Sequence, residues 1–424
     1  MRDDDLQVLG SHQKMMAHKK IAHVLTWIVL PITTVLAGVL LYGLFFEKHE
    51  EDKEVGKTTI VAELQQVVDS ILNNEMEIVG AMQGQAIVMD VKTGRILAMA
   101  GREQRYDGKF QPCENFAYQQ EPGATMMTVA LLALLETELV ELTDEVDAEE
   151  GIWNVDDWQM HDHNWHRGGY GKMTLERALE VSSNIGISKM INKIFKGREL
   201  SYFKLLDKMS FGQPEHVKGI DGLKPMVFSS PKDSTWASRQ LLWNSIGYER
   251  MMAPIQMLTF YNAIANNGKM VKPTLQADKI EVINPQIASN ENIESMQMAL
   301  EHVVSQGLGK KAGTPLLSVA GKTGTSIVGK FDYGEEIYVD EYQLSFCGYF
   351  PADAPKYSII VSMNKLGLPA SGGGMCGPVF HDIVEWMLTH GMPNTLMADD
   401  ETGDTIKITP DNVDSIVNIS AVRN

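Results

Sequence analysis

Two short segments carry side chains that could do chemistry on a polar ligand. Ser182-Ser183-Asn184 offers hydroxyl and amide groups, and Lys322-Thr323-Gly324-Thr325 offers an ammonium group and two hydroxyls. Serines and an asparagine before an apolar stretch are also an ordinary helix cap, so the first segment has a structural explanation. The second is harder to explain by packing, because Gly321 and Gly324 leave the backbone around the lysine open.

A cluster of histidines is a third candidate. His161 and His163 alternate along the chain and could share one face of a strand, with His166 nearby, as metal ligands do. The interleaved Trp158 and Trp165 favour a partly exposed hairpin with ordinary surface histidines instead. We therefore predict no metal site here and no cofactor.

The elements that must position these segments follow from apolar patterning. Two apolar runs, 85–91 and 96–100, flank a Gly-containing turn and predict a β-hairpin whose sheet is covered on both faces. Residues 124–139 are apolar around most of a helix and predict a central core helix. Further helices are expected at 61–72, 174–193, 254–267 and 378–389, and further strands at 318–320, 342–350 and 357–363. Strands at both ends with helices between them indicate an α+β domain whose terminal strands meet in one sheet.

Taken together, these motifs resemble the transpeptidase domain of class B penicillin-binding proteins, over roughly residues 80 to 392. The resemblance rests on the order and spacing of several segments: Glu121-Pro122-Gly123, Val181 to Lys189, Phe211-Gly212-Gln213, Asn244 to Tyr248, Tyr261 to Lys269, Ala320 to Thr325 and Gly348 to Pro351. It implies the fold of penicillin-binding proteins and serine β-lactamases, a mainly antiparallel sheet between helices with a helical subdomain.

The resemblance also exposes a gap. Its Ser-x-x-Lys motif, which supplies nucleophile and general base, falls on Ala124 and Met127. A methyl group cannot attack a carbonyl, and a thioether takes up no proton at neutral pH. Thr125 is turned by about 100° around the helix and Thr128 lies a turn deeper, so neither is an obvious substitute. We expect the covalent chemistry to be absent.

The other two motifs are intact, and the resemblance implies roles for them. Ser182 and Asn184 would flank the cleft, with Asn184 bonding a substrate amide. Lys322 and Thr323 would bind a terminal carboxylate beside Gly324, and the Thr325 backbone N–H would form part of an oxyanion site. Noncovalent binding of a peptidoglycan stem peptide is therefore possible, although these residues could persist for structural reasons alone.

Composition and the amino-terminal residues bear on location. The net charge of −18 argues against nucleic-acid binding. No charged residue occurs from Val24 to Phe46, long enough to span a bilayer, and lysines precede this run while acidic residues follow it. The orientation places Cys113, Cys347 and Cys376 outside the cytoplasm, where one pair could form a disulfide, although three buried thiols are favoured.

The expected organisation is a cytoplasmic tail (1–23), a transmembrane signal anchor (24–46), a stalk and linker helix (47–80), a transpeptidase-like domain (81–392) and a polar tail (393–424). The leading hypothesis is an inactive transpeptidase that scaffolds or regulates cell-wall synthesis from the periplasmic face of the bacterial inner membrane. Its partners would be cell-wall synthase or divisome membrane proteins. The alternatives are a noncovalent sensor of stem peptide or β-lactam, and a residual D,D-transpeptidase with an unusual nucleophile.

Overall fold

The computed structural model describes residues 58–391, except 156, 238, 278–279 and 333–337. Its centre is a six-stranded sheet in the order β12-β13-β14-β1-β2-β3, with every neighbouring pair antiparallel. The strands are β1 (Ala81–Asp90), β2 (Ile96–Gln104), β3 (Phe110–Pro112), β12 (Ala320–Asp332), β13 (Tyr338–Phe350) and β14 (Tyr357–Leu366). The pairing of β1 with β14 confirms that the terminal strands meet in one sheet.

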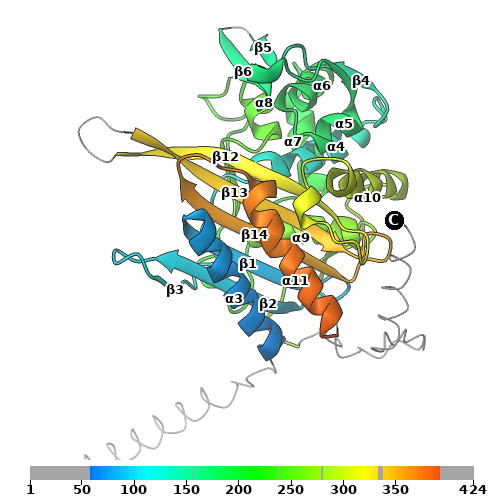
Figure 1. The fold of residues 1–424 in the computed structure, drawn as a ribbon. Coiled ribbons are helices and arrows are strands. Elements are labelled where there is room, and N and C mark those ends of the chain that lie inside the picture. The colour runs from blue at the N-terminus through cyan, green and yellow to red at the C-terminus, as the bar shows by residue number, and fades with distance from the viewer. Residues whose placement is uncertain (1–57, 156, 238, 278–279, 333–337, 392–424) are drawn as a thin grey trace, which may run out of the picture. The chain divides into compact units, whose positions relative to one another are not determined.

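Helices cover both faces of this sheet. On one face α3 (Ala62–Val79) and α11 (Gly377–Thr389) run side by side (Figure 1). The buried residues of α3 recur every fourth position, so that one stripe of the helix packs on the sheet: Leu64, Val68, Leu72 and Met76. The stretch that the sequence grouped with the linker thus belongs to the folded unit that begins at Thr58.

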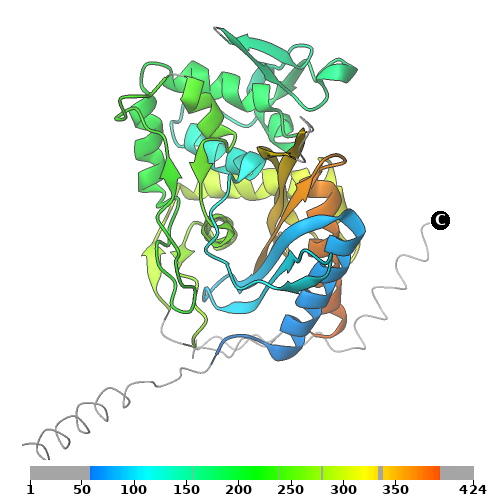
Figure 2. The same ribbon diagram turned by 90° about the vertical axis from the view of Figure 1, so that its left-hand side faces the viewer.

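The opposite face carries the larger hydrophobic core, which is built around α4 (Met126–Leu135) and α9 (Pro254–Ala265). All ten residues of α4 are buried, as expected of a central core helix. Viewed from the side, α3 and α11 lie on one side of the sheet and the remaining helices on the other (Figure 2). The prediction of a sheet covered on both faces is confirmed.

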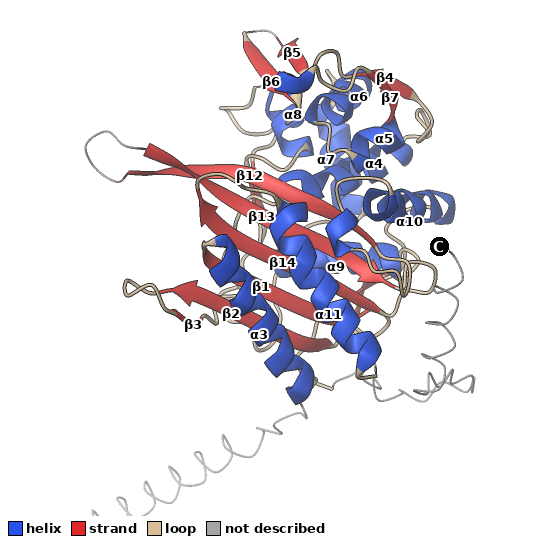
Figure 3. Cartoon of the chain, in the orientation of Figure 1, coloured by secondary structure: helices blue, strands red, loops and turns tan. Residues whose placement is uncertain are grey.

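A largely helical subdomain lies beyond the β12 edge of the sheet (Figure 3). Its helices are α5 (Leu175–Glu180), α6 (Asn184–Phe195), α7 (Glu199–Lys208) and α8 (Arg239–Ser245), and α10 (Asn290–Ser305) runs beside it. Small two-stranded pairs join β4 (Glu145–Asp147) to β7 (Lys172–Thr174), β5 (Ile152–Val155) to β6 (Trp158–His161), β8 (Val227–Phe228) to β9 (Arg250–Met251), and β10 (Met270–Val271) to β11 (Val282–Asn284).

One helix prediction is wrong. The continuous helix expected at 174–193 is broken into α5 and α6. The backbone of Ser182 has a φ of 51°, in the left-handed region that residues other than glycine rarely adopt. The Ser183 hydroxyl accepts a hydrogen bond from the Gly186 N–H and caps α6. The two serines therefore end one helix and start the next.

Within the described residues, no helix is both long and apolar enough to cross a bilayer. The span expected at 24–46 and the polar tail at 393–424 lie outside the described residues. All three cysteines are free thiols; Cys347 and Cys376 are buried and Cys113 is partly exposed.

Candidate functional site

The Lys-Thr-Gly-Thr segment lies on β12, the edge strand of the sheet, and the turn that precedes α4 packs against it. This turn is a short 3-10 helix, η2 (Gly123–Thr125). A Cβ added to Gly324 would lie 3.0 Å from the Pro122 carbonyl oxygen, and one added to Gly123 would lie 3.2 Å from the Thr325 carbonyl carbon. The two glycines allow this close approach, which places Ala124 beside the strand.

The break between α5 and α6 brings the second motif to the same place. The Ser182 hydroxyl accepts a hydrogen bond from the Lys322 ammonium group and lies 3.5 Å from the Thr323 hydroxyl. The Lys322 Nζ also donates to the Thr323 carbonyl oxygen at 3.0 Å. Two motifs 140 residues apart in the chain are thus in direct contact.

Lys322 is fully buried, and burial lowers its pKa to about 7. Desolvation disfavours the charged form of an amine unless an opposite charge compensates it. Among the ion pairs of the described residues, none involves Lys322. Its ammonium group therefore has hydrogen-bond acceptors but no counter-ion, which is an arrangement that a ligand carboxylate would complete.

Asn184 and the neighbouring helix start are held by the hairpin of β5 and β6. The Ser183 hydroxyl donates to Asp162 Oδ2 at 2.6 Å, and Asp162 Oδ1 accepts the Ile185 N–H at 3.0 Å. The Asn184 side chain donates to the His161 carbonyl oxygen at 3.1 Å. The amide that the sequence assigned to a substrate is therefore engaged within the protein, although its oxygen has no such bond.

Asp162 is a site residue that the sequence analysis missed. Its carboxyl group is buried; desolvation raises its pKa, while hydrogen bonds from Ser183 and the backbone act in the opposite direction. It fixes the start of α6 and so the placement of Ser182 and Asn184. Nothing in the local sequence marks it, because its partners lie 21 and 23 residues further along the chain.

Ala124 and Met127, on which the family resemblance places the Ser-x-x-Lys motif, differ in exposure. Ala124 is partly exposed on η2, whereas Met127 is fully buried in the core cluster of α4. The hydroxyls nearby point to other partners: Thr125 donates to the Pro122 carbonyl oxygen at 2.8 Å, and Thr128 lies 2.7 Å from the Tyr261 hydroxyl. Both threonines are buried and neither contacts a base in these bonds.

Thr325 is the exposed member of its motif. Its hydroxyl accepts a hydrogen bond from the Gly372 N–H at 3.0 Å, which connects the glycine-rich turn before α11 to β12. Thr323 is buried, and only 6% of its surface is exposed. The accessible part of the site is therefore formed by Thr325 with the partly exposed Ala124, Ser182 and Asn184.

The histidines contact aromatic side chains. His161 packs edge-on against Trp165 at 5.4 Å between ring centroids, and His163 Nε2 lies 2.7 Å from the Tyr170 hydroxyl. Burial lowers the pKa of His163, with a further contribution from nearby Lys322. In the part of the chain that the structure describes, the trio whose ligand atoms come together is a different one, Glu176, Glu180 and His302.

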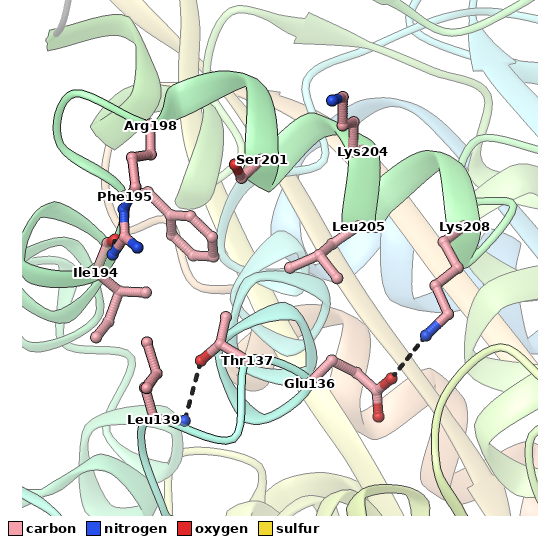
Figure 4. Close-up of a pocket in the computed structure, with 10 residues that line it drawn as sticks. All are labelled: Glu136, Thr137, Leu139, Ile194, Phe195, Arg198, Ser201, Lys204, Leu205 and Lys208. Atoms are coloured by element: carbon pink, nitrogen blue, oxygen red, sulfur yellow. Dashed lines mark hydrogen bonds and ion pairs between the residues drawn. The ribbon is translucent and has the colours of Figure 1, made fainter.

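A cavity of about 430 Å³ lies away from these motifs, between the ends of α4 and α6 and the side of α7 (Figure 4). Its apolar lining includes Leu139, Phe195 and Leu205, and Lys208 reaches across its rim to Glu136. None of the motif residues lines it. The surface at β12 where the Ser-Ser-Asn and Lys-Thr-Gly-Thr segments meet is therefore the candidate site, because it is where the chemistry-bearing side chains come together.

Comparison with known proteins agrees with this geometry. Residues 84–385 match the sequence model of the penicillin binding protein transpeptidase domain. The chain belongs to this family. Both the edge-strand motif and the Ser-Ser-Asn motif lie inside the matched range, and so do Ala124 and Met127.

Relatives extend over most of the described chain. The penicillin-binding protein PbpB of Mycobacterium tuberculosis is 27% identical over 388 residues, which cover 83% of this chain and 54% of that protein. The stage V sporulation protein D of Bacillus subtilis is 25% identical, covering 77% of this chain and 52% of that protein. The chain thus spans about half the length of the curated relatives that it matches.

Solved structures resemble the fold as well. Penicillin binding protein 3 of Mycobacterium tuberculosis in complex with aztreonam matches with a TM-score of 0.66 at 25% identity, covering 79% of each chain. A peptidoglycan glycosyltransferase of Burkholderia ambifaria gives the same TM-score and identity, covering 80% of this chain and 98% of that one. The fold expected from the resemblance is confirmed.

Proposed function

We propose that this chain is a membrane-anchored, catalytically inactive transpeptidase homologue that scaffolds or regulates peptidoglycan synthesis. The observation that carries the proposal is the pair Ala124 and Met127, a methyl and a buried thioether at the positions of nucleophile and base. Nucleophile and base act as a unit, and losing such a unit removes on the order of six orders of magnitude in rate. The nearby hydroxyls of Thr125 and Thr128 are buried and already bonded, which supports the proposal further.

The anchor and the location are part of the proposal. The uncharged run 24–46 would cross the inner membrane once with the amino terminus in the cytoplasm. The transpeptidase-like domain would then face the periplasm, beside the membrane proteins that build the cell wall. A protein in that position can hold a synthase in place without turning over substrate.

The scaffold role predicts a physical complex. Full-length chain, crosslinked in native membranes and purified in detergent, is expected to carry a peptidoglycan synthase or divisome membrane protein with it. The Ala124→Ser/Met127→Lys variant should recover the same partner, because the role does not depend on the covalent centre. Mass spectrometry of the crosslinked species is the measurement. Purification without any cell-wall synthase, with the chain itself abundant, would count against the scaffold.

A second candidate is a noncovalent sensor of stem peptide, and the Lys322 environment favours it. The lysine is fully buried and takes part in no ion pair among the described residues, while Thr325 on the same strand is exposed. A peptide carboxylate that displaced the Ser182 hydroxyl from the buried ammonium group would stabilise its charged form by charge and by hydrogen bonds. Without ligand, Lys322 has a pKa of about 7, so it is mostly neutral above pH 7. Peptide binding above pH 7 would therefore be accompanied by uptake of a proton.

The sensor candidate predicts pH-dependent affinity. A D-Ala-D-Ala peptide with a free carboxylate should bind saturably, most tightly below pH 7, and up to tenfold more weakly per pH unit above it. Isothermal titration from pH 6 to 9 measures this. Lys322→Met should weaken binding at least tenfold, since each lost charge-assisted contact contributes about 1.5–3 kcal/mol.

Two controls separate this effect from others. The same peptide with an amidated carboxyl terminus should lose the pH dependence. His163→Gln should keep it, because burial lowers the pKa of this neighbouring histidine, which moves it away from the range in which Lys322 titrates. Binding that ignores both pH and Lys322 would exclude the sensor and leave the scaffold proposal intact.

A further inference from the structure

A second cluster of polar side chains lies where α5 meets α10, behind the Ser-Ser-Asn motif. Glu176 and Glu180 are four residues apart and so share one face of α5, and His302 reaches them from α10. His302 Nδ1 lies 2.7 Å from Glu176 Oε1. One ligand atom from each of the three side chains lies within 4.8 Å of the other two.

The chemistry of this cluster differs from that of an ordinary acidic surface patch. It includes an imidazole nitrogen, and the Glu180 side chain is only 6% exposed. A third carboxylate lies near the other ring nitrogen of the histidine: Glu301 Oε2 is 3.7 Å from His302 Nε2. Metal-bound histidines usually have such a carboxylate on the ring nitrogen that does not bind the metal, where it fixes the tautomer.

Among the described residues, the carboxylates of this cluster outnumber the cations paired with them. Three carboxylates, Glu176, Glu180 and Glu301, lie around one histidine. The cation that contacts Glu180 is Arg177, whose side chain is 46% exposed and sits one turn away on the same helix. An exposed arginine can swing into solvent at small cost, which would free the buried carboxylate for another cation.

We propose that Glu176, Glu180 and His302 bind a first-row divalent cation, Zn²⁺ by preference. One imidazole nitrogen and two carboxylate oxygens suit zinc, which binds such ligands at about 2.0–2.2 Å and here would keep a fourth position for water. Tetrahedral ligands at that distance lie about 3.4 Å apart, so the three atoms, which are now within 4.8 Å of one another, must draw closer by side-chain rotation. The imidazole disfavours magnesium and calcium, which prefer oxygen ligands.

Zinc bound by these three residues would fix the relative positions of the Ser-Ser-Asn and Lys-Thr-Gly-Thr segments. Glu180 is two residues before Ser182, and its carbonyl oxygen accepts the Leu308 N–H at 3.0 Å. The metal would tie α5, which ends at the Ser-Ser-Asn motif, to α10, which precedes β12 and its lysine. It would therefore hold the two motifs of the cleft together without touching a ligand there.

The test compares metal uptake by full-length, tag-free chain in detergent with uptake by matched variants. Calorimetric titration with Zn²⁺ should show one site in the wild-type chain that His302→Gln and Glu176→Gln weaken at least tenfold. Co²⁺ should give visible absorption bands in the wild-type chain that both variants lose. The matched control is His381→Gln, since His381 Nε2 lies 3.8 Å from Glu385 on α11 at similar exposure but belongs to no trio of possible metal ligands among the described residues.

Circular dichroism checks that each variant is folded. If His302→Gln is unstable, Glu176→Gln still tests the site, because glutamine has nearly the same shape as glutamate. Equal uptake and an unchanged Co²⁺ spectrum in both variants would overturn the proposal. So would loss of the site in a His161→Gln/His163→Gln/His166→Gln variant alone, because the metal would then sit on the hairpin. Weakening by His381→Gln to the same degree would show nonspecific binding and would also overturn it.

Discussion

The double variant Ala124→Ser/Met127→Lys is expected to react covalently with a fluorescent penicillin, whereas the wild-type chain stays unlabelled. A serine at 124 would stand on η2, partly exposed and packed against β12. A lysine at 127 would lie one turn along the same helix, where it can take the hydroxyl proton. Ser182 and Lys322 are already in contact, and η2 packs on the strand that carries the lysine, so both motifs are in place for the variant.

The rate difference should be large. Restoring nucleophile and base together is expected to raise acylation by several orders of magnitude, because the two act as a unit. Either single variant should therefore stay close to the wild-type level. In-gel fluorescence after timed incubation measures the labelling, and unlabelled penicillin added first should abolish it.

The variant carries a stability cost that must be measured beside the labelling. Met127 is fully buried, so an ammonium group placed there loses its hydration without a described counter-charge. A loss of several kcal/mol in unfolding free energy is expected. If the folded double variant is not labelled, the cleft has diverged beyond these two residues. Labelling of the wild-type chain would instead refute the proposal that it is inactive.

The sequence predicted those parts of the fold that depend on local patterning. The hairpin of β1 and β2, the buried helix α4, and the strands β13 and β14 all follow from runs of apolar residues. The break between α5 and α6 was missed because apolar spacing continues across it, although Ser-Ser-Asn is an ordinary helix cap and Ser183 does cap α6. Backbone conformation at one residue can therefore override a helical pattern.

The site was predicted only where motifs carry it. The contact between Ser182 and Lys322 follows from the family resemblance, since no local signal joins residues 140 apart. Asp162, which fixes the start of α6, has no sequence signature of its own. Glu176 and Glu180 do have helical spacing, but their partner His302 comes from a helix more than 120 residues later. Contacts of this kind need the tertiary structure.

Lys322→Met is expected to stabilise the protein. The pKa of Lys322 is lowered from its ordinary 10.5 to about 7. This shift means that keeping the buried ammonium group charged costs the folded state about 5 kcal/mol. Removing the lysine also removes its hydrogen bonds to Ser182 and Thr323, each contributing about 1 kcal/mol. The net expectation is a gain of about 2–4 kcal/mol in unfolding free energy at pH 6.5.

The sign of the pH dependence follows from the same pKa. Because the folded-state pKa lies below the unfolded one, the unfolded chain binds more protons between pH 7 and 10.5. Wild-type stability should therefore rise with pH across this window, and the advantage of Lys322→Met should shrink accordingly. Urea unfolding at pH 6.5, 8 and 9.5 measures both. Lys330→Met removes an exposed lysine from the same strand and should stay within about 0.5 kcal/mol of the wild type.

Unfolding free energy and peptide affinity, measured together for Lys322→Met, distinguish a structural role of this lysine from a role in ligand binding. A variant that is more stable but no longer binds the peptide would mean that the lysine opposes folding and serves a ligand, as the sensor candidate requires. A more stable variant with unchanged peptide binding would exclude the sensor. A variant less stable at pH 6.5 would show that the hydrogen bonds outweigh desolvation, and that Lys322 chiefly holds β12 to the Ser-Ser-Asn motif.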